Sequence, residues 1–165
     1  MESLNRSSRP GGELTGRTVL VTGHTGFKGA WLSLWLSDLG ANVHGIALAP
    51  NDGQRQLFEL VDGMGAFDTS RCLDISRSVE VGEAVAEIAP DFVFHLAAQP
   101  LVRLSYDDPV ETFRSNVMGT VSVLDAVRRH GAQGVICVTS DKCYENVEQI
   151  WPYREADPMG GHDPY

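Results

Sequence analysis

Residues 17–35 read RTVLVTGHTGFKGAWLSLW, and this stretch decides the fold. Apolar and β-branched residues lead into Thr22, glycines recur at Gly23, Gly26 and Gly29, and the pattern then becomes helical. A buried strand, a tight glycine turn and a helix that begins inside the turn predict a dinucleotide-binding start. The spacing is G-x-x-G-x-x-G rather than G-x-G-x-x-G, and an ordinary strand–turn–helix corner is the alternative interpretation.

The glycines of this turn suit a phosphate ligand. A helix N-terminus has unpaired N–H groups and the positive end of the helix dipole, so it is a favourable place for a pyrophosphate. We expect Gly23 and Gly26 to let the ligand approach the backbone, and Gly29 to let the helix press against the strand. Thr25 and Phe27, in the same turn, are included among the predicted cofactor-binding residues.

Length and composition narrow the possible classes of protein. The chain has 165 residues and a formal net charge of −9, which suggest one domain and argue against a nucleic-acid or anionic-membrane surface. Three cysteines without a C-x-x-C pair argue against a disulfide framework or a zinc site, and we expect no bound metal. Residues 1–16 lack the apolar core of a secretory signal, so a soluble, cytoplasmic protein is expected.

Outward from the glycine turn, helical and strand patterns alternate. Helices are predicted over 27–39 (closed by Gly40), 76–89 and 110–130, and strands over 18–22, 42–48, 66–73, 91–97 and 134–140. Residues 1–14 read as a flexible tail, 50–65 as a loop with a short helical piece at 56–61, and 145–165 as a loop. The expected fold of residues 15–165 is α/β, a Rossmann-like doubly wound parallel sheet of strand order 3-2-1-4-5, incomplete at its C-terminal side.

Further cofactor contacts are expected where the third and fourth strands end. Asp74 and Ile75 follow the third strand, and Asp74 either meets the adenine amino group or caps the next helix, a role open to Ser76 as well. Small residues after the fourth strand allow the nicotinamide ribose to approach. The predicted contacts there are Leu96, Ala97 and Ala98.

The second strand lacks the acidic residue that would hold the adenosine ribose about 20 positions after the glycine loop. That place falls at residues 48–50, and the nearest acid is Asp52. Arg55 could bind a 2′-phosphate instead, but we favour NAD over NADP.

Two polar residues lie within apolar patterns. His95 is in the fourth strand, where a hydrogen-bonded core histidine is the favoured interpretation and a catalytic one the alternative. Asn116 is inside the last helix, and a polar side chain there usually has a hydrogen-bonding role. We expect Asn116 to tie the helix to the glycine loop or to order a water near the site.

The reactive groups are expected at the strand ends beside the nicotinamide, after the fifth strand. Ser140, Asp141 and Lys142 follow the fifth strand, and Tyr165 is the last residue. A phenol can act as a base when positive charge nearby lowers its pKa from about 10. A carboxyl beside an amine can divide acid and base duties, with a solvated ion pair as the alternative.

Five stretches make a resemblance to a known family specific. From about residue 14 to 165 the chain resembles the extended short-chain dehydrogenase/reductases, and within them the nucleotide-sugar dehydratases. That group commonly has Thr-Asp-Glu after the fifth strand, whereas Ser-Asp-Lys is similar to the branch that acts on CDP-glucose. The stretches are VTGHTGFKGAWLSLWL (21–36), HLAAQPLVRLSY (95–106), NVMGT (116–120), TSDKCYEN (139–146) and YREADPMGGHDPY (153–165).

The resemblance implies an NAD-dependent lyase that converts CDP-glucose to CDP-4-keto-6-deoxyglucose in deoxysugar biosynthesis, such as that of O-antigen polysaccharide. Tyr165 would take the proton of the sugar C4 hydroxyl, and Ser140 would hydrogen-bond to that hydroxyl. Lys142 would remove the C5 proton, and Asp141 would protonate the departing C6 hydroxyl. A nucleotide-sugar 4-epimerase of the same family and a non-catalytic NAD-binding module are the alternatives.

In the family the tyrosine begins a Tyr-x-x-x-Lys motif, and a sugar-nucleotide domain follows. On this resemblance we expect the chain to be the N-terminal part of a longer protein. Alone it should bind NAD poorly and lack dehydratase activity. The full-length protein is expected to form a homodimer through two long helices, of which 110–130 is one.

Overall fold

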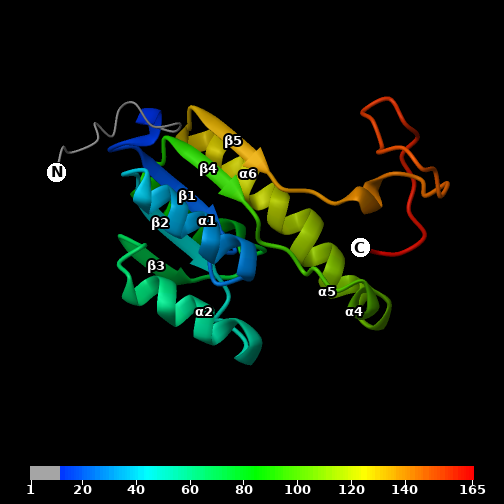
Figure 1. Cartoon of the computed structure of the whole chain (residues 1–165), viewed down its shortest axis with the longest axis horizontal. Coiled ribbons are helices and arrows are strands. Elements are labelled where there is room, and N and C mark those ends of the chain that lie inside the picture. The colour runs from blue at the N-terminus through cyan, green and yellow to red at the C-terminus, as the bar shows by residue number, and fades with distance from the viewer. Residues whose placement is uncertain (1–11) are drawn as a thin grey trace.

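A five-stranded parallel sheet forms the centre of the molecule (Figure 1). In this computed structural model, which describes residues 12–165, the strand order is β3-β2-β1-β4-β5. This order confirms the predicted doubly wound sheet. The strands are β1 (Thr18–Thr22), β2 (Asn42–Ala47), β3 (Thr69–Cys72), β4 (Phe92–His95) and β5 (Gly134–Cys137).

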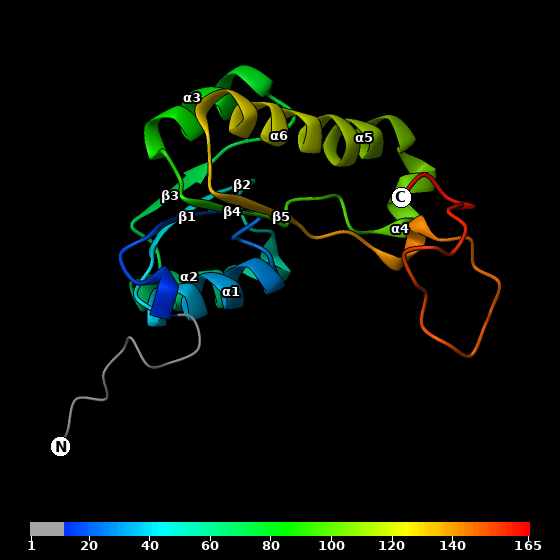
Figure 2. The same ribbon diagram turned by 90° about the horizontal axis from the view of Figure 1, so that it is seen from above.

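Helices cover both faces of the sheet (Figure 2). On one face lie α1 (Phe27–Asp38) and α2 (Asp52–Gly63), and on the other α3 (Ser78–Ile88) and α6 (Gly119–His130). The chain reaches α6 through α4 (Val102–Asp107), α5 (Pro109–Phe113) and the π-turn η3 (Arg114–Met118). Within residues 12–165, none of these helices combines the length and apolar character that crossing a bilayer requires.

The central strand β1 divides the core into two parts. Val19, Leu20 and Val21 are fully buried, and alternate side chains of a strand point to opposite faces. Leu20 therefore packs on the α3 and α6 side, whereas Val19 and Val21 pack on the α1 side. The neighbours of Leu20 include Ile46, Val81, Val85, Val93 and Val123, and those of Val19 and Val21 include Leu36 and Val43.

Helix α1 ends as its sequence predicts. Gly40 has a φ of 86°, and its N–H donates to the carbonyl of Ser37 over 2.9 Å. The N–H of Ala41 donates to the carbonyl of Leu36 over 3.1 Å. This pair of bonds is a Schellman motif, in which a glycine adopts the left-handed conformation that closes the helix.

Three local expectations need correction. The loop predicted over 50–65 contains the full helix α2, because Asn51 and Gln54 form a reciprocal capping box at its start. Residues 1–11 of the predicted tail lie outside the described residues, but Gly12–Leu14 form a 3-10 turn, η2, and Leu14 packs on the α1-side core. The helix predicted over 110–130 is interrupted by the π-turn η3.

His24 is a buried polar residue inside the glycine turn. Its ring meets Phe58 and Phe67 edge-on, with centroids 5.6 and 5.0 Å away. Nε2 shares a hydrogen bond of 2.7 Å with Ser70 Oγ. Burial of the ring lowers the pKa of His24 from 6.5 to about 4.

Gly29 lies where α1 passes over the end of β1. A Cβ at residue 29 would overlap the Gly23 carbonyl, whereas a Cβ on Gly63, at the end of α2, would meet open space. We expect Gly29→Ala to lower the free energy of unfolding by about 1–3 kcal/mol through overpacking. The control Gly63→Ala should leave it unchanged or raise it by up to about 1 kcal/mol. Urea unfolding measures both, and equal effects would contradict this close approach.

The lowered pKa of His24 makes stability depend on pH. Its contribution is complete above the unfolded value of 6.5 and is lost as the pH falls through about 4, because the folded state disfavours the charged ring. Between pH 7 and pH 4 this residue should remove about 3 kcal/mol from the free energy of unfolding. Urea unfolding at several pH values should show a shallower pH slope in His24→Leu, and an unchanged slope would refute the assignment.

Candidate functional site

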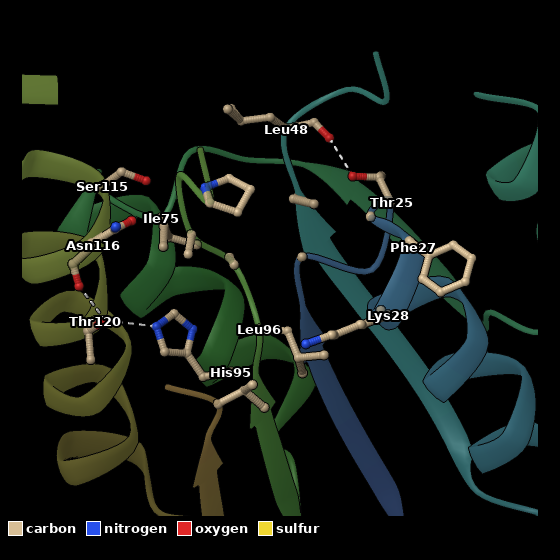
Figure 3. Close-up of a pocket in the computed structure, with 18 of the residues that line it drawn as sticks. Thr25, Phe27, Lys28, Leu48, Ile75, His95, Leu96, Ser115, Asn116 and Thr120 are labelled. Atoms are coloured by element: carbon tan, nitrogen blue, oxygen red, sulfur yellow. Dashed lines mark hydrogen bonds between the residues drawn. The ribbon is translucent and has the colours of Figure 1, made fainter. Parts of the chain in front are cut away.

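A cavity of about 840 Å³ lies across the carboxyl ends of the strands (Figure 3). Its lining comes from the residues that follow β1, β2, β3, β4 and β5. In open α/β sheets this edge is where ligands bind. The volume falls within the range of roughly 300–1,000 Å³ that is usual for small-molecule sites.

The cavity brings together nearly all of the predicted site residues. Of the four predicted catalytic residues, Ser140, Lys142 and Tyr165 line it, whereas Asp141 does not. Their roles and the cofactor contacts stay predictions, because placement alone does not test them. The predicted cofactor-binding residues all line the cavity: Gly23, Thr25, Gly26, Phe27, Gly29, Asp74, Ile75, Leu96, Ala97, Ala98 and Asn116.

Different structural constraints act on the glycines of the turn. Gly23 has a φ of 75°, and a Cβ there would lie 2.8 Å from the backbone nitrogen of Ala97. The close approach of the segment after β4 therefore requires Gly23, and the expectation that Gly23 also admits a ligand stays a prediction. Gly26 has no contact as tight, since its Cβ would lie 3.3 Å from the Gly23 carbonyl oxygen.

The start of α1 offers donors to an anion. The N-cap residue, Gly26, makes no side-chain cap hydrogen bond. The N–H groups of Phe27, Lys28 and Gly29 have no partner inside the helix, because they belong to its first turn. Unpaired N–H groups and the helix dipole at the wall of a cavity fit a pyrophosphate.

The end of β2 presents amides to the cavity rather than a charge. Asn51 and Gln54 line it, whereas Asp52 and Arg55 do not. Asp52 is fully exposed and lies 3.8 Å from the Arg55 guanidinium. Sequence reasoning missed Asn51 and Gln54, although the capping-box spacing N-x-x-Q could have revealed them.

Asp74 lines the cavity and also shapes the chain before α3. Its Oδ1 accepts hydrogen bonds from the Ser76 N–H at 2.9 Å and the Ser76 hydroxyl at 2.8 Å, and its Oδ2 lies 3.3 Å from the Arg114 guanidinium. Burial acts to raise the pKa of Asp74, but the Ser76 hydrogen bonds and Arg114 outweigh it and hold the pKa below its usual value. The N-cap itself is Arg77, so neither Asp74 nor Ser76 caps α3.

His95 is a hydrogen-bonded core residue, as its position in an apolar strand predicts, and is only 3% exposed. Thr22 Oγ1 accepts the N–H groups of Leu96 and Ala97, both at 3.1 Å. Its hydroxyl proton is therefore donated to His95 Nδ1, 2.7 Å away. Burial lowers the pKa of His95, so the ring is neutral and carries its proton on Nε2.

The same chain of hydrogen bonds continues to the π-turn. His95 Nε2 donates to Thr120 Oγ1 over 2.9 Å, and Thr120 Oγ1 donates to the Asn116 carbonyl over 2.7 Å. The side-chain amide of Asn116 forms two hydrogen bonds with the backbone of Gln99. It accepts the Gln99 N–H at 2.7 Å and donates to the Gln99 carbonyl at 3.1 Å. Asn116 thus ties its helix to the segment after β4, not to the glycine loop as one prediction had it.

Two of the predicted catalytic residues, Asp141 and Lys142, lie in a 3-10 turn after β5, η4 (Asp141–Cys143), and Ser140 is its N-cap. Ser140 Oγ accepts the Lys142 N–H at 3.1 Å and donates to Asp141 Oδ1 over 3.3 Å. Lys142 Nζ lies 3.2 Å from Asp163 Oδ2, and the Tyr165 N–H donates to Asp163 Oδ1 over 3.1 Å. Asp163, with a side chain 9% exposed, therefore bridges two candidates, and its distance along the chain from Lys142 hid this role.

We expect long-range 1H–15N spectra to show His95 as the neutral Nε2–H tautomer, with a titration midpoint below the usual 6.5. Thr22→Val removes the hydroxyl that pairs with Nδ1 and with the Ala97 N–H, whereas the Leu96 N–H keeps the Thr22 carbonyl at 3.2 Å. The substitution should therefore weaken this tautomer preference and cost about 2 kcal/mol of stability. Thr18→Val, at the other end of β1, is the matched control. An Nδ1–H tautomer in the parent protein would contradict the hydrogen-bond directions given above.

Comparison with known proteins shows which family this chain resembles. The NAD dependent epimerase/dehydratase family matches residues 19–165. The chain is 53% identical over 152 residues to the CDP-glucose 4,6-dehydratase of Salmonella typhimurium, which covers 91% of this chain and 42% of that protein. It is 29% identical over 140 residues to the CDP-paratose 2-epimerase of Salmonella typhi, covering 84% and 41%.

A solved structure agrees with these matches. The UDP-glucose-4-epimerase of Stenotrophomonas maltophila, with bound NAD and formylated UDP-arabinopyranose, superposes with a TM-score of 0.77 at 25% identity, covering 90% of this chain and 44% of that one. The chain thus spans less than half the length of these relatives. Because the family match extends over most of its residues, the chain belongs to the NAD dependent epimerase/dehydratase family.

Proposed function

We propose that this protein acts in the NAD-dependent dehydration of CDP-glucose to CDP-4-keto-6-deoxyglucose. The observation that carries the proposal is that Ser140, Lys142 and Tyr165 line the same cavity as the glycine turn. The 53% identity with a CDP-glucose 4,6-dehydratase supports the choice of substrate. Ser-Asp-Lys after β5 supports dehydration as the reaction.

The residues present fit NAD. The uncapped start of α1 suits its pyrophosphate, and the small side chains of Ala97 and Ala98 leave room beside the end of β4. Bound NAD would supply a reversible hydride acceptor. Amides at Asn51 and Gln54 can hydrogen-bond to ribose hydroxyls, so a carboxylate is not needed there.

The proton transfers of the proposed reaction fall to the residues after β5. Tyr165 takes the proton of the C4 hydroxyl, while Ser140 hydrogen-bonds to that oxygen. Once C4 is a ketone the C5 proton is acidic, and Lys142 accepts it. Asp141 gives a proton to the C6 hydroxyl, which leaves as water. The 6-deoxy product then forms when C6 regains the hydride that left C4 and Lys142 returns its proton to C5.

Two contacts must change for this chemistry. The ion pair of Lys142 with Asp163 has to open before the lysine nitrogen can accept a proton. Asp141, which accepts a hydrogen bond from Ser140 and does not itself line the cavity, has to turn toward the substrate. Both residues lie in a short turn on the surface, where such rearrangements cost little packing.

A nucleotide-sugar 4-epimerase is the second candidate, favoured by the structural likeness to a UDP-glucose-4-epimerase. An epimerase needs Tyr165 and the glycine turn but has no use for the Asp141–Lys142 pair. A non-catalytic NAD-binding module needs only the glycine turn, and the residues after β5 count against it.

We also propose that the full-length protein is a cytoplasmic homodimer. An apolar row runs along α5, η3 and α6 with helical spacing, and its side chains are exposed. Such a row on a helix is suited to a second copy of the same helix. Its members are Val110, Phe113, Val117, Val121 and Leu124.

The function is tested with CDP-glucose and the full-length protein that contains this chain. We expect a 4-keto product that absorbs in alkali, whereas formation of CDP-galactose would favour the epimerase. Tyr165→Phe and Lys142→Met should each slow dehydration at least about a hundredfold. Both variants should lower C5 deuterium exchange, because the C4 ketone must form first. Only Lys142→Met should abolish this exchange while leaving hydride transfer measurable. Glu59→Gln on α2 is the control, and unchanged turnover in Lys142→Met would refute the assigned base.

A further inference from the structure

We infer that Lys28 binds the pyrophosphate of the dinucleotide, an inference that rests on the proposed function. Lys28 is the second residue of α1 and lines the cavity. Figure 3 shows its side chain reaching from the start of α1 toward Leu96, at the end of β4. The ammonium group is thus directed across the end of β1 into the cavity rather than out along the helix.

The charges of the cavity single out this residue. The charged side chains in its lining are Lys28, Asp74, Glu111 and Lys142. Lys142 pairs with Asp163, and both Asp74 and Glu111 pair with the same arginine. Within residues 12–165, Lys28 alone of these four has no ion pair or hydrogen bond to its side chain.

The composition of the chain strengthens this point. The sequence has two lysines, Lys28 and Lys142, and both line the cavity, whereas none of the arginines within residues 12–165 does. The net charge of −9 repels anionic ligands from the protein as a whole. A local cation inside the cavity offsets this repulsion where a diphosphate has to bind.

The position of Lys28 indicates that it binds the pyrophosphate rather than another part of the ligand. Its own N–H and those of Phe27 and Gly29 are unpaired in the same helical turn, so the ammonium and the helix N-terminus favour one anion together. β1 and β4 are the neighbours between which the chain changes its direction of winding, and a dinucleotide crosses the sheet edge at that point. An ammonium–phosphate contact is a charge-assisted hydrogen bond.

Binding measurements on the full-length protein that contains this chain test the inference. Calorimetry with ADP-ribose, NAD and adenosine compares the parent with Lys28→Met and Lys28→Arg. We expect Lys28→Met to weaken ADP-ribose and NAD alike, by about tenfold or more, and to leave adenosine unchanged. Lys28→Arg should keep most of the affinity. Arg17→Met, which removes a cation at the opposite end of β1, is the matched control.

A second readout follows the lysine side chain directly. Full-length protein labelled with 13C at lysine Cε gives a signal for each lysine, and Lys28→Met identifies the signal of Lys28. Addition of ADP-ribose should shift the Lys28 signal, whereas adenosine should leave it in place.

The outcomes separate this inference from the proposed function. Equal affinities of the parent and Lys28→Met for ADP-ribose would overturn the role of Lys28 alone. A loss confined to NAD would place the ammonium at the nicotinamide and would also overturn it. Failure of the full-length parent protein to bind either NAD or ADP-ribose would count against both this role and the proposed NAD site.

Discussion

The contact between two backbone segments at the end of β1 is the constraint on which the site depends. Gly23 meets the backbone of Ala97, and Gly29 in α1 meets the carbonyl of Gly23, with no side chain between them. This approach sets the start of α1 directly over the end of the central strand. The uncapped N–H groups of that helix and the Lys28 side chain reach the cavity for this reason.

Behind the cavity a chain of hydrogen bonds holds β1, β4 and the last helix in register. Thr22, His95 and Thr120 form it, and each hydroxyl or ring nitrogen has one direction of donation available. Because the chain ends at the carbonyl of Asn116, it also supports the π-turn, whose amide holds Gln99. The wall next to the predicted nicotinamide position is therefore built from satisfied polar groups rather than from apolar packing alone.

The two lysines of the site, one after β5 and one in the glycine turn, have different charged surroundings. At the β5 end, Asp163 neutralises Lys142 and holds the backbone of Tyr165. At the glycine end, no acidic side chain among residues 12–165 pairs with Lys28. In the proposed reaction, breaking the ion pair of Lys142 would control its proton transfer, and the permanent charge of Lys28 would meet a phosphate.

The sequence by itself determined the strand order, the glycine turn, the closure of α1 by Gly40 and the set of residues at the strand ends. These depend on local patterns, which the chain carries in short stretches: apolar runs, glycine spacing and alternation of strand with helix. Only the tertiary structure decided which partners those residues meet. It brought Asp163 to Lys142, assigned Gly23 to the approach of Ala97 and directed Asn116 to Gln99. Such contacts join positions far apart in the chain, and their geometry arises when the sheet and its helices pack together.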